Sequence, residues 1–232
     1  MQDVVRESNE AGHISERELP KALESLRKDF PSGIPECGAD ALRYGLCMYD
    51  VSSAQINLDL TIVKTAGAFA NKVWQASRFL VMAHHRAKSL PSLAVADNAA
   101  SLLPQDRWIL SRCAVTVSQM EQHLDERNFP LMPRCLRRFM YTNLCDVYLE
   151  AAKPYLADPD SEHFATTLAT LQLVLITGLK LMHPLMPFLT EELYHRVPPL
   201  AGERRKDSIM VEKYPLGSEV EEARARYSFF FS

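Results

Sequence analysis

The chain has 232 residues, a formal net charge of −3, and 47% hydrophobic against 24% charged residues, the composition of an ordinary folded domain. The slightly acidic total excludes binding to nucleic acid through overall charge, so such a function needs a local patch of Lys and Arg. Five cysteines without a C-x-x-C pair argue against a disulfide framework and a zinc site. They favour reduced thiols in a cytosolic protein.

No segment of the sequence predicts a contact with a membrane. Residues 1–18 contain neither a cationic start nor an apolar run, so we expect no signal peptide. The longest apolar segment, 168–182, is interrupted by Gln172, Gly178 and Lys180. It is too short and too polar to span a bilayer, and we expect a core helix.

The first 60 residues divide into two parts. Residues 1–30 are polar and contain one short predicted helix, 19–28, which suits a surface connector. Residues 31–60 begin with a turn-rich segment and continue into a predicted helix over 39–48 with Leu42, Leu46 and Tyr49 facing inward. Polar and apolar residues then alternate over 55–60, which predicts a brief strand.

A long amphipathic helix is predicted over 61–87. Its apolar stripe, at helical spacing, comprises Ile62, Ala66, Phe69, Val73, Ala76, Leu80 and Ala83. Phe79 and Met82 lie instead on the polar face, among Lys, Arg and amide side chains. An aromatic ring held there can stack an unpaired base while its neighbours contact phosphates. The alternative is that a neighbouring helix covers Phe79.

Four more helices complete an all-α, antiparallel bundle over 61–198. The second starts near Pro104 and ends at 128–130, and the third ends at Lys153 and Pro154. The third brings together a basic and aromatic cluster, which forms either an RNA contact or a solvated face with a snorkelling tyrosine: Arg134, Arg137, Arg138 and Tyr141. The fourth opens at 160–162, and the fifth covers 188–196 after Pro187. A tail over 199–232 packs back on the bundle through residues 209–211.

The sequence offers no catalytic or metal site. Glu10 and His13, and Glu192 and His195, have the E-x-x-H spacing of di-iron bundles, which also need inward carboxylates on two further helices. Glu10 and His13 lie in a polar stretch beside Gly12, however, and His195 lies at the end of a predicted helix. We interpret these residues, and the His84–His85 pair, as surface groups. There is no glycine-rich phosphate loop and no nucleophile motif.

Several stretches, in this order, resemble the C-terminal portion of valyl-tRNA synthetase, a class I aminoacyl-tRNA synthetase: FPSGIPECGADALRYGLC, INLDL, NKVWQASRF, DRWILSR, LCDVYLEAAKP and HPLMPFLTEELYHRVP. The resemblance extends from about residue 21 to residue 214. It implies a helical anticodon-binding bundle preceded by a short α/β remnant of the segment that contacts the tRNA stem. It also implies that the full enzyme, with ATP and magnesium, esterifies valine onto its tRNA through catalytic and editing domains absent from this chain, which should be inactive alone.

The family's N-K-L-W-N-A-x-K-F block corresponds to residues 71–79. The resemblance implies that this helix faces the anticodon loop of tRNA(Val), through Asn71, Lys72, Trp74, Gln75, Arg78 and Phe79. We also expect secondary RNA contacts from Lys64, Arg86, Arg134, Arg138 and Tyr141. No metal and no cofactor are expected in this chain, and we expect a monomer.

The sequence departs from the family at four positions. Gln75 replaces an Asn, which keeps an amide that can pair with a base edge. Ala54, Ile62 and Gly67 stand where relatives commonly carry basic residues, and each lost phosphate contact weakens binding. The alternative function is therefore a non-catalytic helical interaction module that has lost its tRNA contacts and uses the Phe-rich end or the Arg134–Tyr141 cluster.

Overall fold

The computed structural model describes residues 2–29, 33, 36–49, 59–89, 91 and 102–217. The chain divides into two units, Met1–Cys37 and Gly38–Ser232. The first contains α1 (Gln2–Glu10) and α2 (Leu19–Asp29), which pack on each other. Their mutual face is built from half-buried side chains, since no described residue of this unit is fully buried.

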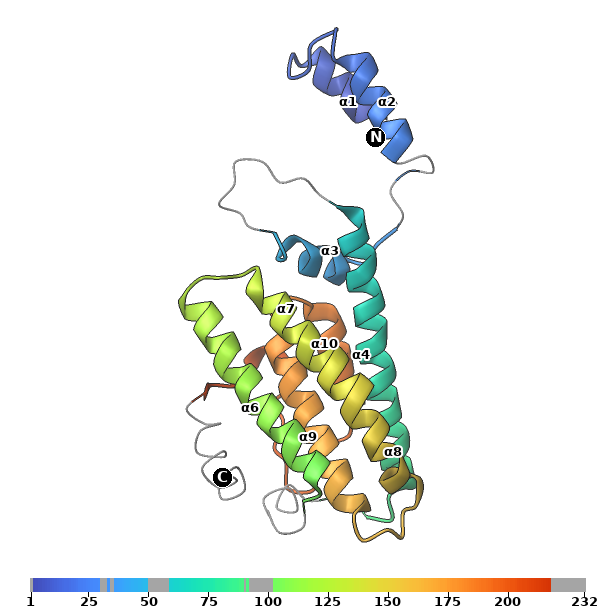
Figure 1. Cartoon of the computed structure of the whole chain (residues 1–232), viewed down its shortest axis with the longest axis vertical. Coiled ribbons are helices and arrows are strands. Elements are labelled where there is room, and N and C mark those ends of the chain that lie inside the picture. Colours follow the sequence, from blue (N-terminus) through green and yellow to red (C-terminus); the bar gives the residue numbers. More distant parts are fainter. Residues whose placement is uncertain are drawn as a thin grey trace. The chain divides into compact units, whose positions relative to one another are not determined.

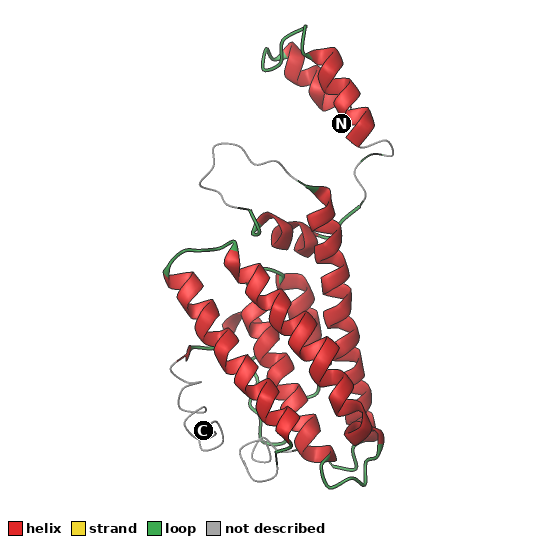
Figure 2. Ribbon diagram, viewed as in Figure 1, coloured by secondary structure: helices red, strands yellow, loops and turns green. Residues whose placement is uncertain are grey.

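The second unit is an all-α bundle (Figure 1). Its elements are α3 (Ala39–Leu46), α4 (Leu60–Arg86), α6 (Pro104–Asp125), α7 (Leu131–Arg137), η2 (Arg138–Tyr148), α8 (Leu149–Ala157), α9 (Phe164–Met182), α10 (Pro187–Arg196) and η3 (Ile209–Val211). Figure 2 shows helices joined by loops, with no strand in the described part of the chain. The predicted all-α class is confirmed.

α9 forms the centre of the bundle. It contacts α6, α8, α10, α4 and η2, and most of its side chains are buried on every side. Of the described helices it is the one long and apolar enough to cross a membrane, yet 78% of that stretch is buried within the chain, as in the core helix of a globular domain. The predicted core helix is thus present, although it begins at Phe164 rather than near residue 160.

α7, η2 and α8 follow one another without interruption from Leu131 to Ala157. The middle segment has π-helical hydrogen bonding, which the sequence did not predict. The predicted end at Lys153 and Pro154 is wrong, because the helix continues to Ala157 with Pro154 inside it. Leu156, two residues later, is buried in the core, and that burial offsets the backbone hydrogen bond that proline cannot donate.

α3 packs on α4 through a different face from the one predicted. Leu42 and Leu46 are 38% and 45% exposed, whereas Ala41, Tyr44 and Gly45 are buried. The helix approaches α4 closely, since a Cβ on Gly45 would lie 3.2 Å from Val63 Cγ2. The Tyr44 hydroxyl also donates to the Pro133 carbonyl at 2.5 Å. Small residues and this buried hydrogen bond set the orientation of α3. The sequence prediction was wrong because it relied on leucine hydrophobicity alone.

α10 is fixed at both ends. At its start the Asp40 carboxylate accepts from the backbone N–H groups of Phe188 (3.3 Å) and Leu189 (2.6 Å). At its end the Arg205 guanidinium donates to the Val197 carbonyl at 2.5 Å. The predicted span, with Pro187 as the first residue, is confirmed.

Two further predictions concern the strand over 55–60 and the position of His84. The predicted strand over 55–60 lies outside the described residues except for Asp59, which caps α4, and Leu60, which begins it. His84 is not a surface group: it is buried, and its Nε2 is hydrogen-bonded to Gln172 of α9. Burial, opposed by that hydrogen bond, lowers its pKa and keeps the ring neutral.

Candidate nucleic-acid interface

The solvent side of α4 is a single ridge that we call the α4 ridge. The Asp59 carboxylate starts the helix by accepting from the Thr61 N–H at 2.8 Å. From there exposed residues recur every three or four positions: Lys64, Ala68, Asn71, Gln75, Arg78, Met82 and Arg86. At 1.5 Å per residue the ridge is roughly 33 Å long, with a cation at each end and one in its second half.

The polar groups in the middle of the ridge are unused. The side chains of Asn71, Gln75 and Arg78 form no hydrogen bond or ion pair with any described residue. An amide offers both a donor and an acceptor to a base edge, and a guanidinium offers donors to a phosphate. Three exposed side chains of this kind in succession, with no internal partner, form a surface that is open to a polar ligand.

Lys72 behaves differently from these three. Its Nζ lies 2.6 Å from Asp146 Oδ1 and 4.3 Å from the centre of the Tyr141 ring, both on η2. The hydrogen bond to Asp146 raises the pKa of Lys72 against the opposing effect of desolvation. Lys72 therefore connects α4 to η2, and its charge is already balanced within the protein.

Phe79 is half-buried rather than uncovered. Its ring packs against Ala76, Cys145 and Leu149, so contact with η2 and α8 explains an aromatic residue on the polar face. The alternative drawn from the sequence, that a neighbouring helix covers Phe79, is therefore partly correct. The other part of the ring lines an open groove of about 320 Å³, the η2 groove, together with Lys72, Gln75, Ala76, Cys145, Asp146, Leu149, Glu150 and Lys153.

The charges of the η2 groove cancel. Lys72 pairs with Asp146, and Lys153 Nζ lies 2.6 Å from Glu150 Oε1. Burial raises the pKa of Cys145 to about 11, so its thiol is neutral at physiological pH. A ring with two balanced ion pairs at the rim suits an uncharged, flat group better than a phosphate.

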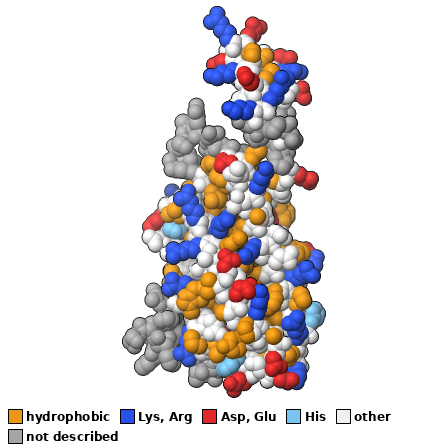
Figure 3. All heavy atoms as spheres, turned by 45° about the vertical axis from the view of Figure 1, so that its right-hand side comes forward, with side chains coloured by type: hydrophobic (Ala, Val, Ile, Leu, Met, Phe, Trp, Pro, Cys, Tyr) orange, Lys and Arg blue, Asp and Glu red, His pale blue; other side chains and the backbone are white. Residues whose placement is uncertain are grey.

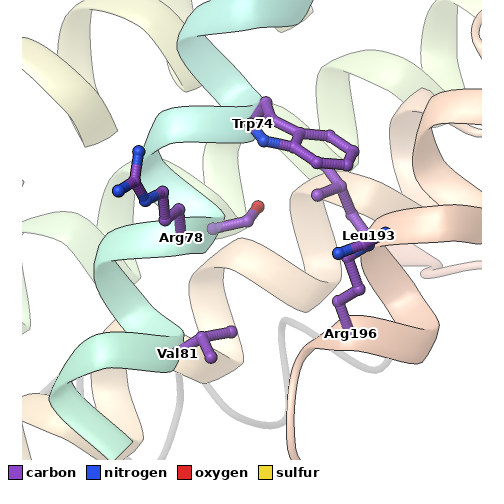
Figure 4. A pocket seen from close by; sticks show the side chains of 6 residues that line it. Trp74, Arg78, Val81, Leu193 and Arg196 are labelled. Carbon is purple, nitrogen blue, oxygen red and sulfur yellow. The ribbon is translucent and has the colours of Figure 1, made fainter.

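Trp74 lines a second groove, on the other flank of the α4 ridge. We call it the α10 groove; its volume is about 330 Å³ and its lining is Trp74, Ser77, Arg78, Val81, Leu193 and Arg196. The Arg196 guanidinium lies 5.1 Å from the centre of the indole ring. Figure 4 shows Trp74 and the two α10 side chains facing each other across the groove, while Arg78 points away from the indole.

The secondary contacts predicted from the sequence are spread over three elements. Lys64 and Arg86 occupy the two ends of the α4 ridge, while Arg134 on α7 and Arg138 on η2 are exposed. Tyr141 is half-buried beside Lys72, which joins the predicted basic cluster to α4. Figure 3 shows Lys and Arg scattered among hydrophobic and acidic side chains on the face that includes the α4 side.

Two of the positions without the family's basic residue lie away from the ridge. Ile62 and Gly67 are half-buried on the side of α4 next to α3: Ile62 Cγ2 is 3.7 Å from where a Cβ on Gly45 would be, and a Cβ on Gly67 would be 4.0 Å from Ala41 Cβ. Their substitution leaves the ridge cations in place. Ala54 lies outside the described residues.

Sequence reasoning did not find the walls of the two grooves. Asp146, Glu150 and Lys153 recur at helical spacing on η2 and α8, and Arg196 follows Leu193 by one turn on α10. That spacing could have identified each as a surface position. Nothing in it indicates that these faces meet α4.

The fold and this surface together define a class: a helical bundle with an elongated polar ridge between two aromatic grooves, as expected of a domain that binds an unpaired nucleic-acid strand. A family profile agrees with this class. The chain belongs to the family described as the anticodon-binding domain of tRNA ligase, whose profile matches residues 106–230, more than half of the chain.

Similarity to individual proteins narrows this family to the valine–tRNA ligases. The chain is 39% identical to human mitochondrial valine–tRNA ligase over 224 residues, which cover 95% of this chain and 20% of that protein. It is 37% identical to the valine–tRNA ligase of Caenorhabditis elegans over 212 residues, 90% of this chain and 20% of the relative. The resemblance to the anticodon-binding portion of valyl-tRNA synthetase is confirmed. The chain spans about a fifth of the length of these relatives.

Proposed function

We propose that this bundle binds the anticodon loop of tRNA(Val) through the α4 ridge and the η2 groove. The observation that carries the proposal is the unpaired polar row of Asn71, Gln75 and Arg78 beside the half-exposed ring of Phe79. The ring stacks a loop base, the two amides hydrogen-bond to base edges, and the guanidinium contacts the backbone.

The full-length protein would be a valine–tRNA ligase in which this bundle orients the tRNA. Relatives that carry that name are about five times the length of the matched region, which leaves the catalytic and editing domains to the rest of the protein. ATP and magnesium would bind those domains. The isolated 232-residue chain should bind tRNA as a monomer and should not attach valine to it.

The test is a titration of labelled tRNA(Val) with the chain, followed by fluorescence polarisation. Wild-type chain should bind tRNA(Val) more tightly than a tRNA with a substituted anticodon. The triple variant Asn71→Ala, Gln75→Ala, Arg78→Ala should lose affinity at least ten-fold, since it removes two base-edge contacts and a phosphate contact. The ridge is exposed, so its fold should be unchanged. Equal binding of both tRNAs by wild type and variant would contradict the proposal.

The competing function is the protein-interaction module. The Phe-rich segment at 229–231 lies outside the described residues. Of the basic and aromatic cluster, Arg134 and Arg138 are exposed, whereas Arg137 and Tyr141 are half-buried. Light scattering at two concentrations, with and without residues 217–232, separates a self-associating scaffold from a monomer. Concentration-dependent association combined with no affinity for tRNA would favour the scaffold.

We also propose the cytosol as the compartment of the full-length protein, in keeping with its unpaired cysteines. Relatives named as mitochondrial, from human and Arabidopsis thaliana, make the mitochondrion the competing outcome. Fluorescence microscopy of the tagged full-length protein decides between the two compartments.

A further inference from the structure

Trp74 and Phe79 cannot contact the same base. They are five residues apart on α4, which places them about 140° apart around the helix and about 7.5 Å apart along it. The ridge residues Gln75 and Arg78 lie between them, and each aromatic ring faces a different neighbouring helix. If Phe79 stacks one nucleotide, Trp74 is available only to another.

The two grooves also differ in charge. The η2 groove contains two lysines and two carboxylates, already paired. The lining of the α10 groove includes two arginines and no carboxylate. Arg78 has no partner among the described residues, while Arg196 Nε lies 2.6 Å from Glu192 Oε1 in an exposed ion pair, so the surplus positive charge of this groove is that of Arg78. An aromatic ring with surplus positive charge around it is suited to a base that keeps its phosphate.

We propose that the α10 groove is a second nucleotide subsite, in which an unpaired base packs against Trp74 and its phosphate is bound by Arg196 with help from Arg78. This inference rests on the proposed function. It adds that the RNA strand crosses α4 and places one nucleotide on each side of the ridge. Arg78, which belongs to both the ridge and the groove lining, holds the backbone at the crossing.

Charge complementarity and continuity with the ridge favour RNA as the occupant over an apolar peptide. Val81 and Leu193 give the groove an apolar floor, but its rim is cationic. An apolar helix would bury the Arg78 guanidinium without a partner and would remove the Arg196–Glu192 ion pair from water. A nucleotide supplies the planar apolar surface for the floor and the anion for the rim.

The chain provides its own reporter for this subsite. Its two tryptophans are Trp74 and Trp108, and Trp108 lies on α6, half-buried against the core. In the variant Trp108→Phe the emission comes from Trp74 alone. Titration with an anticodon stem-loop transcript of tRNA(Val), while polarisation of a label on the RNA reports total binding, should quench Trp74 with the same midpoint as the polarisation change.

Three further variants, made in the Trp108→Phe background, distinguish a nucleotide contact from simple packing. Arg196→Gln should weaken binding several-fold and reduce the slope of log K against log salt by about 0.7, the value for one single-strand phosphate. Glu192→Gln releases Arg196 from its carboxylate and should tighten binding. Arg112→Gln, an exposed arginine of α6, should change neither quantity and serves as the matched control.

The outcomes separate the two proposals. Saturating RNA that is bound by polarisation but leaves Trp74 emission unchanged would overturn the second subsite and leave anticodon binding intact. An effect of Arg196→Gln that is independent of salt would also overturn it. Absence of any RNA binding would overturn both the subsite and the proposed function.

Discussion

The two grooves on either side of α4 share one helix but differ in what holds their walls and what they can bind. The wall of the η2 groove is part of the core helix run α7–η2–α8, and its charges are neutralised internally. The wall of the α10 groove is a ten-residue helix held by Asp40 of α3 at its start and by Arg205 at its end, and its arginine, Arg196, is engaged only in an exposed ion pair with Glu192. An aromatic side chain therefore acquires its ligand preference from the charges around it.

Phe79→Leu should have the largest effect on RNA binding. Leucine keeps the packing against Ala76, Cys145 and Leu149 but removes the aromatic face. Loss of one stacked base, about 1 to 3 kcal/mol, predicts a five-fold to hundred-fold weaker complex with tRNA(Val) and an unchanged salt slope. Polarisation titrations at several salt concentrations measure both.

The control for Phe79→Leu is Trp74→Leu in the other groove. Its loss of affinity should be accompanied by a lower salt slope. Without the indole ring, the base no longer holds the RNA phosphate beside Arg196. Identical salt slopes for the two variants would show that the grooves do not differ in the way their charges predict.

Tyr148→Phe tests what holds the wall of the η2 groove. The Tyr148 hydroxyl donates to the buried Asp106 Oδ1 at 2.6 Å, and burial raises the pKa of Asp106 in spite of that bond. Without the hydroxyl the Asp106 carboxylate keeps only the hydrogen bond from the Leu103 N–H to its Oδ2, at 3.1 Å. We expect the free energy of unfolding to fall by about 1 to 3 kcal/mol in urea denaturation.

Tyr155→Phe is the matched control, because the Tyr155 hydroxyl has no hydrogen bond to a described residue. It should change stability by less than about 0.5 kcal/mol. If both tyrosine variants lost the same stability, the Asp106–Tyr148 bond would not be what supports this wall.

The sequence predicted the helices well and their contacts poorly. The apolar period over 61–87 located α4 almost to the residue, because a long amphipathic pattern is decided locally. It could not show that Phe79 meets η2, that His84 reaches Gln172, or that Leu42 and Leu46 stay exposed. Those contacts depend on which neighbouring helix packs against each face. The hydrophobic pattern of a single helix contains no information about its neighbours.

Glu212 tests the support behind the α10 groove. Burial tends to raise the pKa of this carboxylate, but hydrogen bonds from Lys180, the Lys206 N–H and Tyr194 prevail and lower it to about 2. A depressed pKa adds stability above the unfolded value of 4.5, and this stability is lost as pH falls toward 2. Because Tyr194 belongs to α10, the loss should loosen that wall first.

For Glu212→Gln we expect a loss of roughly 1 to 2 kcal/mol at pH 7, a value reduced for partial screening by solvent. The difference between variant and wild type should vanish in urea titrations near pH 2. A difference that stays constant between pH 7 and pH 2 would mean that the carboxylate charge does not contribute.

Lys72→Met should have the smallest effect, although the family resemblance places Lys72 in the site. Its ammonium is engaged by Asp146 and Tyr141, and the pair is exposed, with 35% and 42% of the two side chains accessible. Removing it costs less than about 1 kcal/mol of stability and frees a carboxylate beside Phe79 without removing a phosphate contact. RNA affinity should therefore change by less than about three-fold, against a larger loss for Arg78→Met on the same helix. A loss for Lys72→Met equal to that for Arg78→Met would mean that RNA displaces Asp146, and the η2 groove would then bind backbone as the α10 groove does.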